Sequence, residues 1–290
     1  QFVRLGMALE FSYFKVIEMN EFLGKVAVIT GAGSGIGRAL AVSLAQQGCN
    51  LALADINTES LEQTQVILDS DLFDGSVQVT LHTVDVSQWS DVQALAESVK
   101  EQHGRVNLLI NNAGVGLGSL FKDASLDDMR WVMDINYWGV VYGCKAFLPL
   151  IKKTGGSTIV NVSSVFGLVT VPMSTAYCSS KFAVRGFSDA LRHEVGYMGS
   201  DIKVACAFPS GIKTAIAQNS KVTLHTKSKT SVEQQKANME AHFLTTPEQA
   251  ATDILNGVRK GKSRIKVGKG STLMDLASRL FPVNYIRFFK

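Results

Sequence analysis

The chain has 290 residues, a formal net charge of +4, 46% hydrophobic residues and 19% charged residues. This composition supplies ample apolar material for one large core, and the charge is too weak to indicate a nucleic-acid partner. The four cysteines fit neither a zinc site nor a disulfide framework, which predicts reduced thiols and a cytoplasmic protein.

The first twenty residues are aromatic and amphipathic, and charged side chains interrupt them. They lack the apolar core and cleavage site of a signal peptide. No apolar run in the sequence reaches the roughly 18–20 residues of a membrane span. We treat residues 1–20 as an N-terminal extension, either added during cloning or lying upstream of a native start at Met19, and leave them out of the fold.

From residue 21 onward, short apolar runs alternate with longer segments of helical period. Several runs are almost continuously apolar, as strands covered on both faces must be. The predicted strands lie at 25–30, 50–55, 77–85, 107–110, 157–162, 202–208 and 264–268. The predicted helices lie at 36–47, 58–70, 88–102, 126–153, 175–198 and 247–259. The alternation predicts a single-domain α/β fold with a doubly wound parallel sheet over residues 21–270.

Two segments fall outside this alternation. The stretch 216–242 is polar and Lys-rich and shows no strand pattern, which predicts a substrate lid at 212–245. The C-terminal segment 271–290 is an amphipathic tail, and its apolar helical face is formed by Leu273, Leu276, Ala277 and Leu280. We expect this tail to cover the substrate cleft or to contact a subunit, and an interfacial membrane helix is the alternative.

The loop after the first strand, TGAGSGIG at 30–37, leads into a helix that we expect to begin at Ile36 or Gly37. Glycine removes the Cβ that would block a phosphate, and a helix N-terminus offers free N–H groups. A tight structural turn is the alternative, because the glycine spacing differs from the common G-x-G-x-x-G fingerprint. The residues expected to bind the phosphates of a dinucleotide are Gly31, Ser34, Gly35, Ile36 and Gly37.

Asp55 ends the second predicted strand. A carboxylate at that point can accept hydrogen bonds from both ribose hydroxyls of an adenosine, and it repels a 2′-phosphate. Residue 34 is Ser rather than a basic residue, and Arg38 lies one step into the helix. This balance predicts NAD rather than NADP, and a helix cap or turn acid is the alternative role for Asp55.

The stretch TAYCSSKFAV at 175–184 places Tyr177 and Lys181 four residues apart on one helical face. A nearby ammonium stabilises a phenolate and lowers the pKa of tyrosine, so the pair is suited to move a proton to or from an alcohol oxygen. Ser164 follows the strand at 157–162. It can hold the same oxygen, because strand ends and helix starts share one rim of a parallel sheet. Without such a partner, the Tyr–Lys pair would be ordinary helix surface.

Five motifs in chain order together resemble the short-chain dehydrogenase/reductase family, of the classical type, over residues 22–268. They are TGAGSGIG at 30–37, NNAG at 111–114, DIN at 134–136, the set of Ser164, Tyr177 and Lys181, and PSGIKT at 209–214. One departure is Ser210, which stands where the family usually has glycine.

The resemblance implies a Rossmann-like fold and a role for each matching residue. Tyr177 would be the acid/base, Ser164 would bind the substrate oxygen, and Lys181 would contact the nicotinamide ribose. Asn136 would hold a water in a proton relay. Further cofactor contacts would come from Asp85, Val86, Asn112, Gly114, Ile212 and Thr214.

We therefore predict an oxidoreductase that transfers a hydride reversibly between NAD(H) and a secondary alcohol or ketone, with no metal site among the scattered histidines. An apolar substrate is expected from Val115, Leu117, Leu120, Phe121, Phe166, Val169, Val171 and Met173. The resemblance implies a homodimer or homotetramer that pairs through helices 126–153 and 175–198. The alternatives are a catalytically silent dinucleotide-binding sensor or scaffold, and a membrane-surface lipid dehydrogenase.

Overall fold

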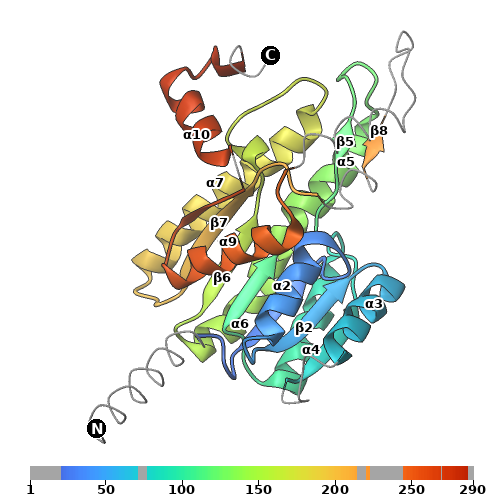
Figure 1. Ribbon diagram of the computed structural model, residues 1–290, viewed down its shortest axis with the longest axis vertical. Helices are drawn as coiled ribbons and strands as arrows, with labels where there is room; N and C mark the ends of the chain where they lie inside the picture. Colours follow the sequence, from blue (N-terminus) through green and yellow to red (C-terminus); the bar gives the residue numbers. More distant parts are fainter. Residues whose placement is uncertain (1–20, 71–76, 214–219, 223–243, 269, 287–290) are drawn as a thin grey trace, which may run out of the picture.

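The computed structural model describes residues 21–70, 77–213, 220–222, 244–268 and 270–286 (Figure 1). Seven strands form one parallel sheet in the order β3-β2-β1-β4-β6-β7-β9. The strands are β1 (Val26–Thr30), β2 (Asn50–Asp55), β3 (Val79–Thr83), β4 (Leu108–Asn111), β6 (Thr158–Val162), β7 (Lys203–Pro209) and β9 (Arg264–Val267). A separate parallel pair joins β5 (Leu117–Gly118) to β8 (Lys221–Val222).

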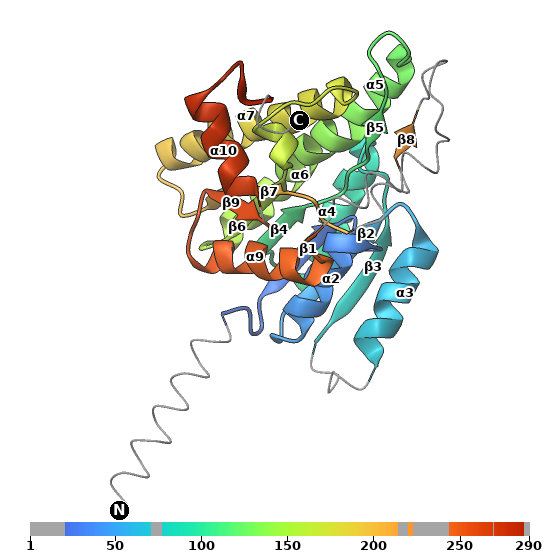
Figure 2. The same ribbon diagram turned by 45° about the horizontal axis from the view of Figure 1, so that its top comes forward.

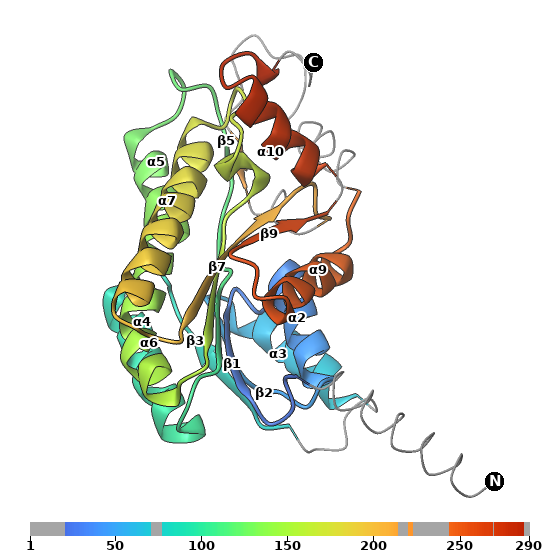
Figure 3. The ribbon, with the colours of Figure 1, turned by 90° about the vertical axis from the view of Figure 1, so that its left-hand side faces the viewer.

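Helices cover both faces of the sheet (Figure 3). One face carries α2 (Gly35–Ala45), α3 (Thr58–Asp69) and α9 (Pro247–Arg259). The other carries α4 (Trp89–His103), α6 (Gly139–Thr154) and α7 (Thr175–Tyr197). The remaining helical elements are α5 (Leu126–Met133), η1 (Asp134–Trp138), η2 (Val165–Gly167) and α10 (Ser271–Leu280). The prediction of a single-domain, doubly wound parallel α/β fold is confirmed.

The central strands owe their continuous apolar character to burial on both faces. Every residue of β1 and β4 is buried. The edge strand β3 is only partly buried, because helices and neighbouring strands cover less of it, and it carries more polar residues. The strand predicted over 77–85 is therefore shorter than its apolar pattern suggested.

The chain reverses direction across the sheet beside β1. It runs from β1 outward through β2 to β3 and then returns to the other side of β1 as β4. Such a reversal opens a crevice at the carboxyl ends of the strands, which is where open α/β sheets bind ligands. The elements β5, α5 and α10 lie at one end of the molecule (Figure 1; Figure 2).

The segment predicted as one helix over 126–153 is not regular. A π-helical turn, η1, separates α5 from α6, and Asn136 is buried within it. A π turn holds one residue more than an α turn, and such bulges often occur at functional sites. The pattern of apolar residues did not reveal this insertion, because the helix continues on both sides of it.

The predicted lid at 212–245 lies mostly outside the described residues, as does the extension at 1–20. The described part of the lid includes β8, whose two residues pair with β5. The expectation that 216–242 contains no strand is therefore wrong. A strand this short leaves no periodic pattern, since its pairing partner lies far away in the sequence.

Helix α10 attaches to the body through its polar face. Asp275 is only 5% exposed, and its Oδ2 lies 2.8 Å from the Lys266 Nζ of β9. The leucines of the predicted apolar face are 65%, 52% and 63% exposed at Leu273, Leu276 and Leu280. That face is turned to solvent and does not cover the cleft, because the ion pair holds the opposite side of the helix against the sheet. In the described part of the chain, no helix is long and apolar enough to cross a membrane.

Candidate active site

The glycine-rich loop after β1 packs so tightly that side chains are excluded at two positions. A Cβ on Gly37 would lie 2.0 Å from the carbonyl oxygen of Gly31, and a Cβ on Gly33 would lie 2.9 Å from Asp55 Oδ2. Gly31 itself has a φ of +67°, a conformation that favours glycine. Asn112 Nδ2, at the end of β4, donates a hydrogen bond to the Gly31 carbonyl at 3.2 Å. Bare backbone is thus held at the crevice between β1 and β4.

Helix α2 begins at Gly35, slightly earlier than predicted, and its N-terminus faces the crevice. Among the described residues no side chain caps this terminus, and its first turn contains no acidic residue. Unpaired N–H groups and the positive end of the helix dipole attract anions. Ser34, Gly35 and Ile36 line the pocket there, whereas Gly37 acts by letting the helix approach Gly31. The arrangement fits a phosphate group.

Asp55 is held against the glycine-rich loop. Its Oδ2 accepts a hydrogen bond from the Gly33 amide at 2.9 Å, and its Oδ1 accepts one from the Asn57 amide at 3.0 Å. Asp55 also lines the pocket. Sequence analysis did not single out Gly33, although it is the second glycine of TGAGSGIG. The need for glycine there becomes visible only when Ser60 and Asp55 are placed beside it, since a Cβ on Gly33 would lie 2.7 Å from Ser60 Cβ.

The Arg38 guanidinium donates its hydrogen bonds to acceptors within the protein. Its Nε donates to Thr64 Oγ1 at 3.0 Å, and its Nη2 donates to the carbonyl oxygens of Gly33 and, at 3.3 Å, Ser60. These contacts tie the loop to α3. They also direct the guanidinium away from the role of a phosphate ligand.

The structure also places most of the other predicted cofactor residues. Asp85 and Val86 line the pocket, and Asp85 Oδ1 accepts hydrogen bonds from the Ser87 amide at 2.9 Å and the Ser87 hydroxyl at 2.7 Å. Asn112, Gly114 and Ile212 line it as well. Thr214 lies outside the described residues.

The predicted catalytic side chains Ser164, Tyr177 and Lys181 meet in the same pocket. Lys181 Nζ lies 5.8 Å from the centroid of the Tyr177 ring and donates a hydrogen bond to the Val162 carbonyl at 3.1 Å. The Ser164 hydroxyl is hydrogen-bonded to Tyr177. The ring of Phe166 packs edge-on against Tyr177, with 6.2 Å between the centroids. The tyrosine is therefore held between a hydroxyl, a cation and an aromatic ring.

Burial is the main influence on the pKa values of Tyr177 and Lys181. It raises the pKa of Tyr177 to about 12, and the hydrogen bond with Ser164 works in the opposite direction. The rise is contrary to the lowered pKa expected from a neighbouring ammonium. Burial also lowers the pKa of Lys181 to about 8. At neutral pH Tyr177 is thus a phenol beside an ammonium group.

Asn136 connects the loop after β4 to the start of α7. Its Oδ1 accepts from the Val115 amide at 2.8 Å, and its Nδ2 donates to the Val115 carbonyl at 2.9 Å and to Ser180 Oγ at 3.1 Å. Ser180 Oγ in turn donates to the Tyr177 carbonyl at 2.8 Å. The Asn136 side chain therefore positions the backbone that carries Tyr177. The proton relay through Asn136 stays a prediction.

The pocket has a volume of about 750 Å³ and is mostly apolar. The sequence analysis named eight residues that favour an apolar substrate. Five of them line the pocket: Val115, Leu117, Phe166, Val171 and Met173. Leu120, Phe121 and Val169 fall outside it, and Phe121 is 66% exposed. Within the described part of the chain, no group of three or more His, Cys, Asp and Glu residues is arranged to hold a metal ion.

The family model described as short chain dehydrogenase matches residues 25–224. The chain belongs to the short-chain dehydrogenase/reductase family. It is 42% identical over 269 residues to a Mycobacterium tuberculosis protein that carries the name oxidoreductase SadH, covering 93% of this chain and 95% of that protein. The mouse protein named estradiol 17-beta-dehydrogenase 11 is 30% identical, over 92% of this chain and 83% of that protein.

Solved structures show the same relationship. A short-chain dehydrogenase/reductase from Burkholderia phymatum, in complex with NAD, is 31% identical to this chain. It superimposes with a TM-score of 0.80 and covers 93% of this chain and 96% of that one. The family assignment therefore rests on both sequence and fold, and the chain is an oxidoreductase of this family.

Two positions of this short-chain dehydrogenase/reductase gain a role only from the structure. Ser163 donates a hydrogen bond to the Lys181 carbonyl at 2.8 Å and so joins the end of β6 to α7. Ser180, which the sequence did not single out, connects Asn136 to Tyr177. The spacing of three residues between Tyr177 and Ser180 was the available signal, but the other partner, Asn136, is 44 residues away in the chain.

Proposed function

We propose that this short-chain dehydrogenase/reductase transfers a hydride reversibly between NAD(H) and an apolar secondary alcohol or ketone. The observation that carries the proposal is the presence of Ser164, Tyr177 and Lys181 in one pocket with Asp55 and the N-terminus of α2. Alcohol oxidation removes a proton from oxygen and a hydride from carbon. A proton-exchanging side chain and a dinucleotide cradle in one cavity are what this reaction needs.

A nicotinamide dinucleotide is supported as the cofactor by the Burkholderia phymatum relative, which was solved in complex with NAD. The uncapped N-terminus of α2 and the bare backbone around Gly31 and Gly35 would hold its phosphates. Asp55 would bind the adenosine ribose, and Lys181 the nicotinamide ribose. When bound, the nicotinamide supplies the site that accepts or donates the hydride.

Tyr177 is the group that exchanges a proton with the substrate oxygen. In ketone reduction, its phenol donates a proton to the oxygen on which negative charge develops, and a pKa of about 12 keeps that proton in place beforehand. In alcohol oxidation, Tyr177 must act as a phenolate, which the Lys181 ammonium favours. Ser164 donates a hydrogen bond to the substrate oxygen and stabilises its charge.

Replacing Lys181 with Met should weaken NAD binding and shift to higher pH the limb of the alcohol-oxidation profile on which activity rises with pH. The ribose contact is lost, and the Tyr177 phenolate loses a stabilising cation. Since burial lowers the pKa of Lys181 to about 8, the unmodified enzyme carries the ammonium below that pH and loses it above. The two profiles of kcat/KM against pH should thus differ most below pH 8. Superimposable profiles would show that Lys181 does not tune Tyr177.

The apolar lining of the pocket supports an apolar substrate. The residues available to contact it are Val115, Leu117, Phe166, Val171, Pro172 and Met173. Burial of a hydrocarbon against such a wall contributes roughly 25 cal/mol per Å². The name of the mouse relative, an estradiol dehydrogenase, is that of an enzyme acting on a largely apolar alcohol and supports the same class.

The proposal is tested by a screen of secondary alcohols with NAD and of ketones with NADH, following NADH absorbance. We expect turnover with apolar substrates and little with sugars. A protein that binds NAD but turns over none of them would favour the alternative of a catalytically silent sensor or scaffold. The pairing of Tyr177 and Lys181 in one pocket favours the enzyme.

Cofactor preference follows from Asp55 and Arg38. NAD should bind at least about tenfold tighter than NADP, which corresponds to about 1.4 kcal/mol. The reason is that the Asp55 carboxylate repels a 2′-phosphate, while Arg38 is occupied by Gly33, Ser60 and Thr64. Asp55→Ala should reduce the difference between the affinities for NAD and NADP. Titration of both cofactors checks this, and equal or tighter NADP binding by the unmodified protein would refute the assignment.

We also propose a homodimer or homotetramer in the cytoplasm. Partly exposed aromatic side chains of α4, η1 and α6 support an interface that includes the 126–153 segment. Trp89 and Trp138 are 40% and 43% exposed, and their rings lie 5.6 and 5.7 Å from that of Tyr142. The four free, buried cysteines are consistent with a reducing compartment.

A further inference from the structure

One wall of the pocket is formed by the loop 168–174, between η2 and α7. Val171, Pro172, Met173 and Ser174 of this loop all line the pocket. The loop also connects Ser164 to Tyr177 along the chain. Its position therefore decides how much room lies beside the proposed reacting oxygen.

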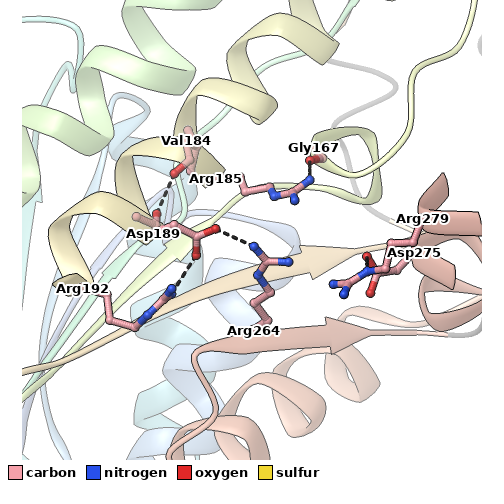
Figure 4. Close-up of polar contacts among 9 residues, drawn as sticks. Gly167, Val184, Arg185, Asp189, Arg192, Arg264, Asp275 and Arg279 are labelled. Carbon is pink, nitrogen blue, oxygen red and sulfur yellow. Dashed lines mark hydrogen bonds and ion pairs between the residues drawn. The ribbon is translucent and has the colours of Figure 1, made fainter. Parts of the chain in front are cut away.

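The catalytic domain fixes this loop at both ends. Arg185 Nη1 donates to the Gly167 carbonyl at 3.2 Å, as Figure 4 shows. At the other end, the Met173 carbonyl accepts a hydrogen bond from the Ser119 amide at 2.8 Å. Met173 has a φ of +62°, a strained value for a residue other than glycine. The loop thus needs its contacts to keep this conformation.

The middle of the loop is held by a residue of the C-terminal segment. Tyr285 Oη accepts a hydrogen bond from the Thr170 amide at 2.7 Å and lies 2.7 Å from Thr170 Oγ1. Thr170 is exposed, so these contacts take the place of water on a loop that would otherwise present its backbone to solvent. The two residues are 115 positions apart in the sequence.

Tyr285 is a firm anchor because the segment that carries it is attached to the sheet. Asp275 of α10 is buried and pairs with Lys266 of β9 at 2.8 Å. It also pairs with Arg279 of its own helix at 3.0 Å (Figure 4). Helix α10 packs against both β9 and η2. After α10, the Tyr285 amide donates to the Phe281 carbonyl at 3.0 Å. A continuous path of contacts therefore runs from the sheet edge to Thr170.

We infer that Tyr285 is a positioning residue for the substrate wall, so that the C-terminal segment acts on substrate selection through Thr170 rather than by covering the cleft. The leucines of α10 face solvent and do not reach the pocket, whereas the Tyr285 hydroxyl holds the loop whose side chains line it. The substrate class in this inference rests on the proposed function. The contact between Tyr285 and Thr170 does not depend on it.

The test is Tyr285→Phe, which keeps the ring and removes only the hydroxyl. Hydrogen exchange in the 168–174 segment should become about fivefold faster, the effect of losing one ordinary hydrogen bond. With 2-octanol as the probe, KM should rise by about the same factor while kcat changes less. With 2-propanol, which is too small to reach the loop side chains, KM should hardly change. NAD affinity should stay as in the unmodified protein.

Tyr197→Phe is the matched control, because Tyr197 is 94% exposed at the far end of α7 and should show none of these changes. Thr170→Val, which removes the second contact only, should give a smaller rise in KM. Unchanged exchange in 168–174, or equal changes in KM for both alcohols, would overturn the inference. If the unmodified protein oxidises neither these two alcohols nor any other in the screen, the proposed function fails, and hydrogen exchange alone still decides whether Tyr285 holds the loop.

Discussion

Replacement of Tyr177 by Phe is expected to lower turnover by about 100-fold or more, the usual scale of general acid–base catalysis. The change deletes the hydroxyl that exchanges a proton with the substrate oxygen. It keeps the ring that packs edge-on against Phe166 at 6.2 Å. Because no cavity is created and the phosphate cradle is untouched, the melting temperature and NAD affinity should be nearly unchanged. Steady-state kinetics in both reaction directions, with NAD titration and thermal unfolding, measure these three quantities.

Two results would separate chemistry from packing at this position. A folded Tyr177→Phe protein that binds NAD and turns over near the unmodified rate would show that the Tyr–Lys pair is structural. Tyr197→Phe, which removes the same hydroxyl from an exposed site, should keep full activity. The pKa of Tyr177 is raised, and alcohol oxidation needs its phenolate form. The rate of alcohol oxidation should therefore increase as the pH rises.

Gly37→Ala is expected to damage the dinucleotide cradle. The new Cβ would lie 2.0 Å from the Gly31 carbonyl oxygen, whereas non-bonded heavy atoms are most stable at roughly 3.5 Å or more. The glycine-rich loop must move, and overpacking of this kind costs about 1–3 kcal/mol. That loss outweighs the gain of about 1 kcal/mol from placing Ala in a helix. NAD affinity should fall by about tenfold or more, measured by titration calorimetry.

Gly186→Ala is the matched control, and we expect it to stabilise the protein rather than to damage the site. Gly186 lies inside α7, and among the described residues no atom outside its own helix and chain neighbours lies within 4 Å of the Cβ it would gain. Only the helix propensity then acts, so stability should rise by up to about 1 kcal/mol with unchanged NAD affinity. If Gly37→Ala behaved like Gly186→Ala, the close approach of α2 to Gly31 would not be a requirement of the site.

The sequence by itself determined the features that depend on local pattern. Alternating apolar runs and helical segments specified the parallel sheet, because buried strands must be apolar on both faces. The i, i+4 spacing of Tyr177 and Lys181 placed them on one face of α7, and the position of Asp55 at a strand end placed it at the binding rim. These inferences needed no knowledge of which distant segments touch.

Tertiary structure decided everything that depends on a distant partner or on burial. The requirement for glycine at Gly33 comes from Ser60 and Asp55, and the role of Ser163 comes from the Lys181 carbonyl. A lysine lies near Tyr177, yet the pKa of Tyr177 rises, because desolvation of a buried phenolate outweighs the effect of the hydrogen bond with Ser164. The leucine face of α10 points outward because one ion pair fixes its other side, and periodicity along a helix does not say which side faces the body.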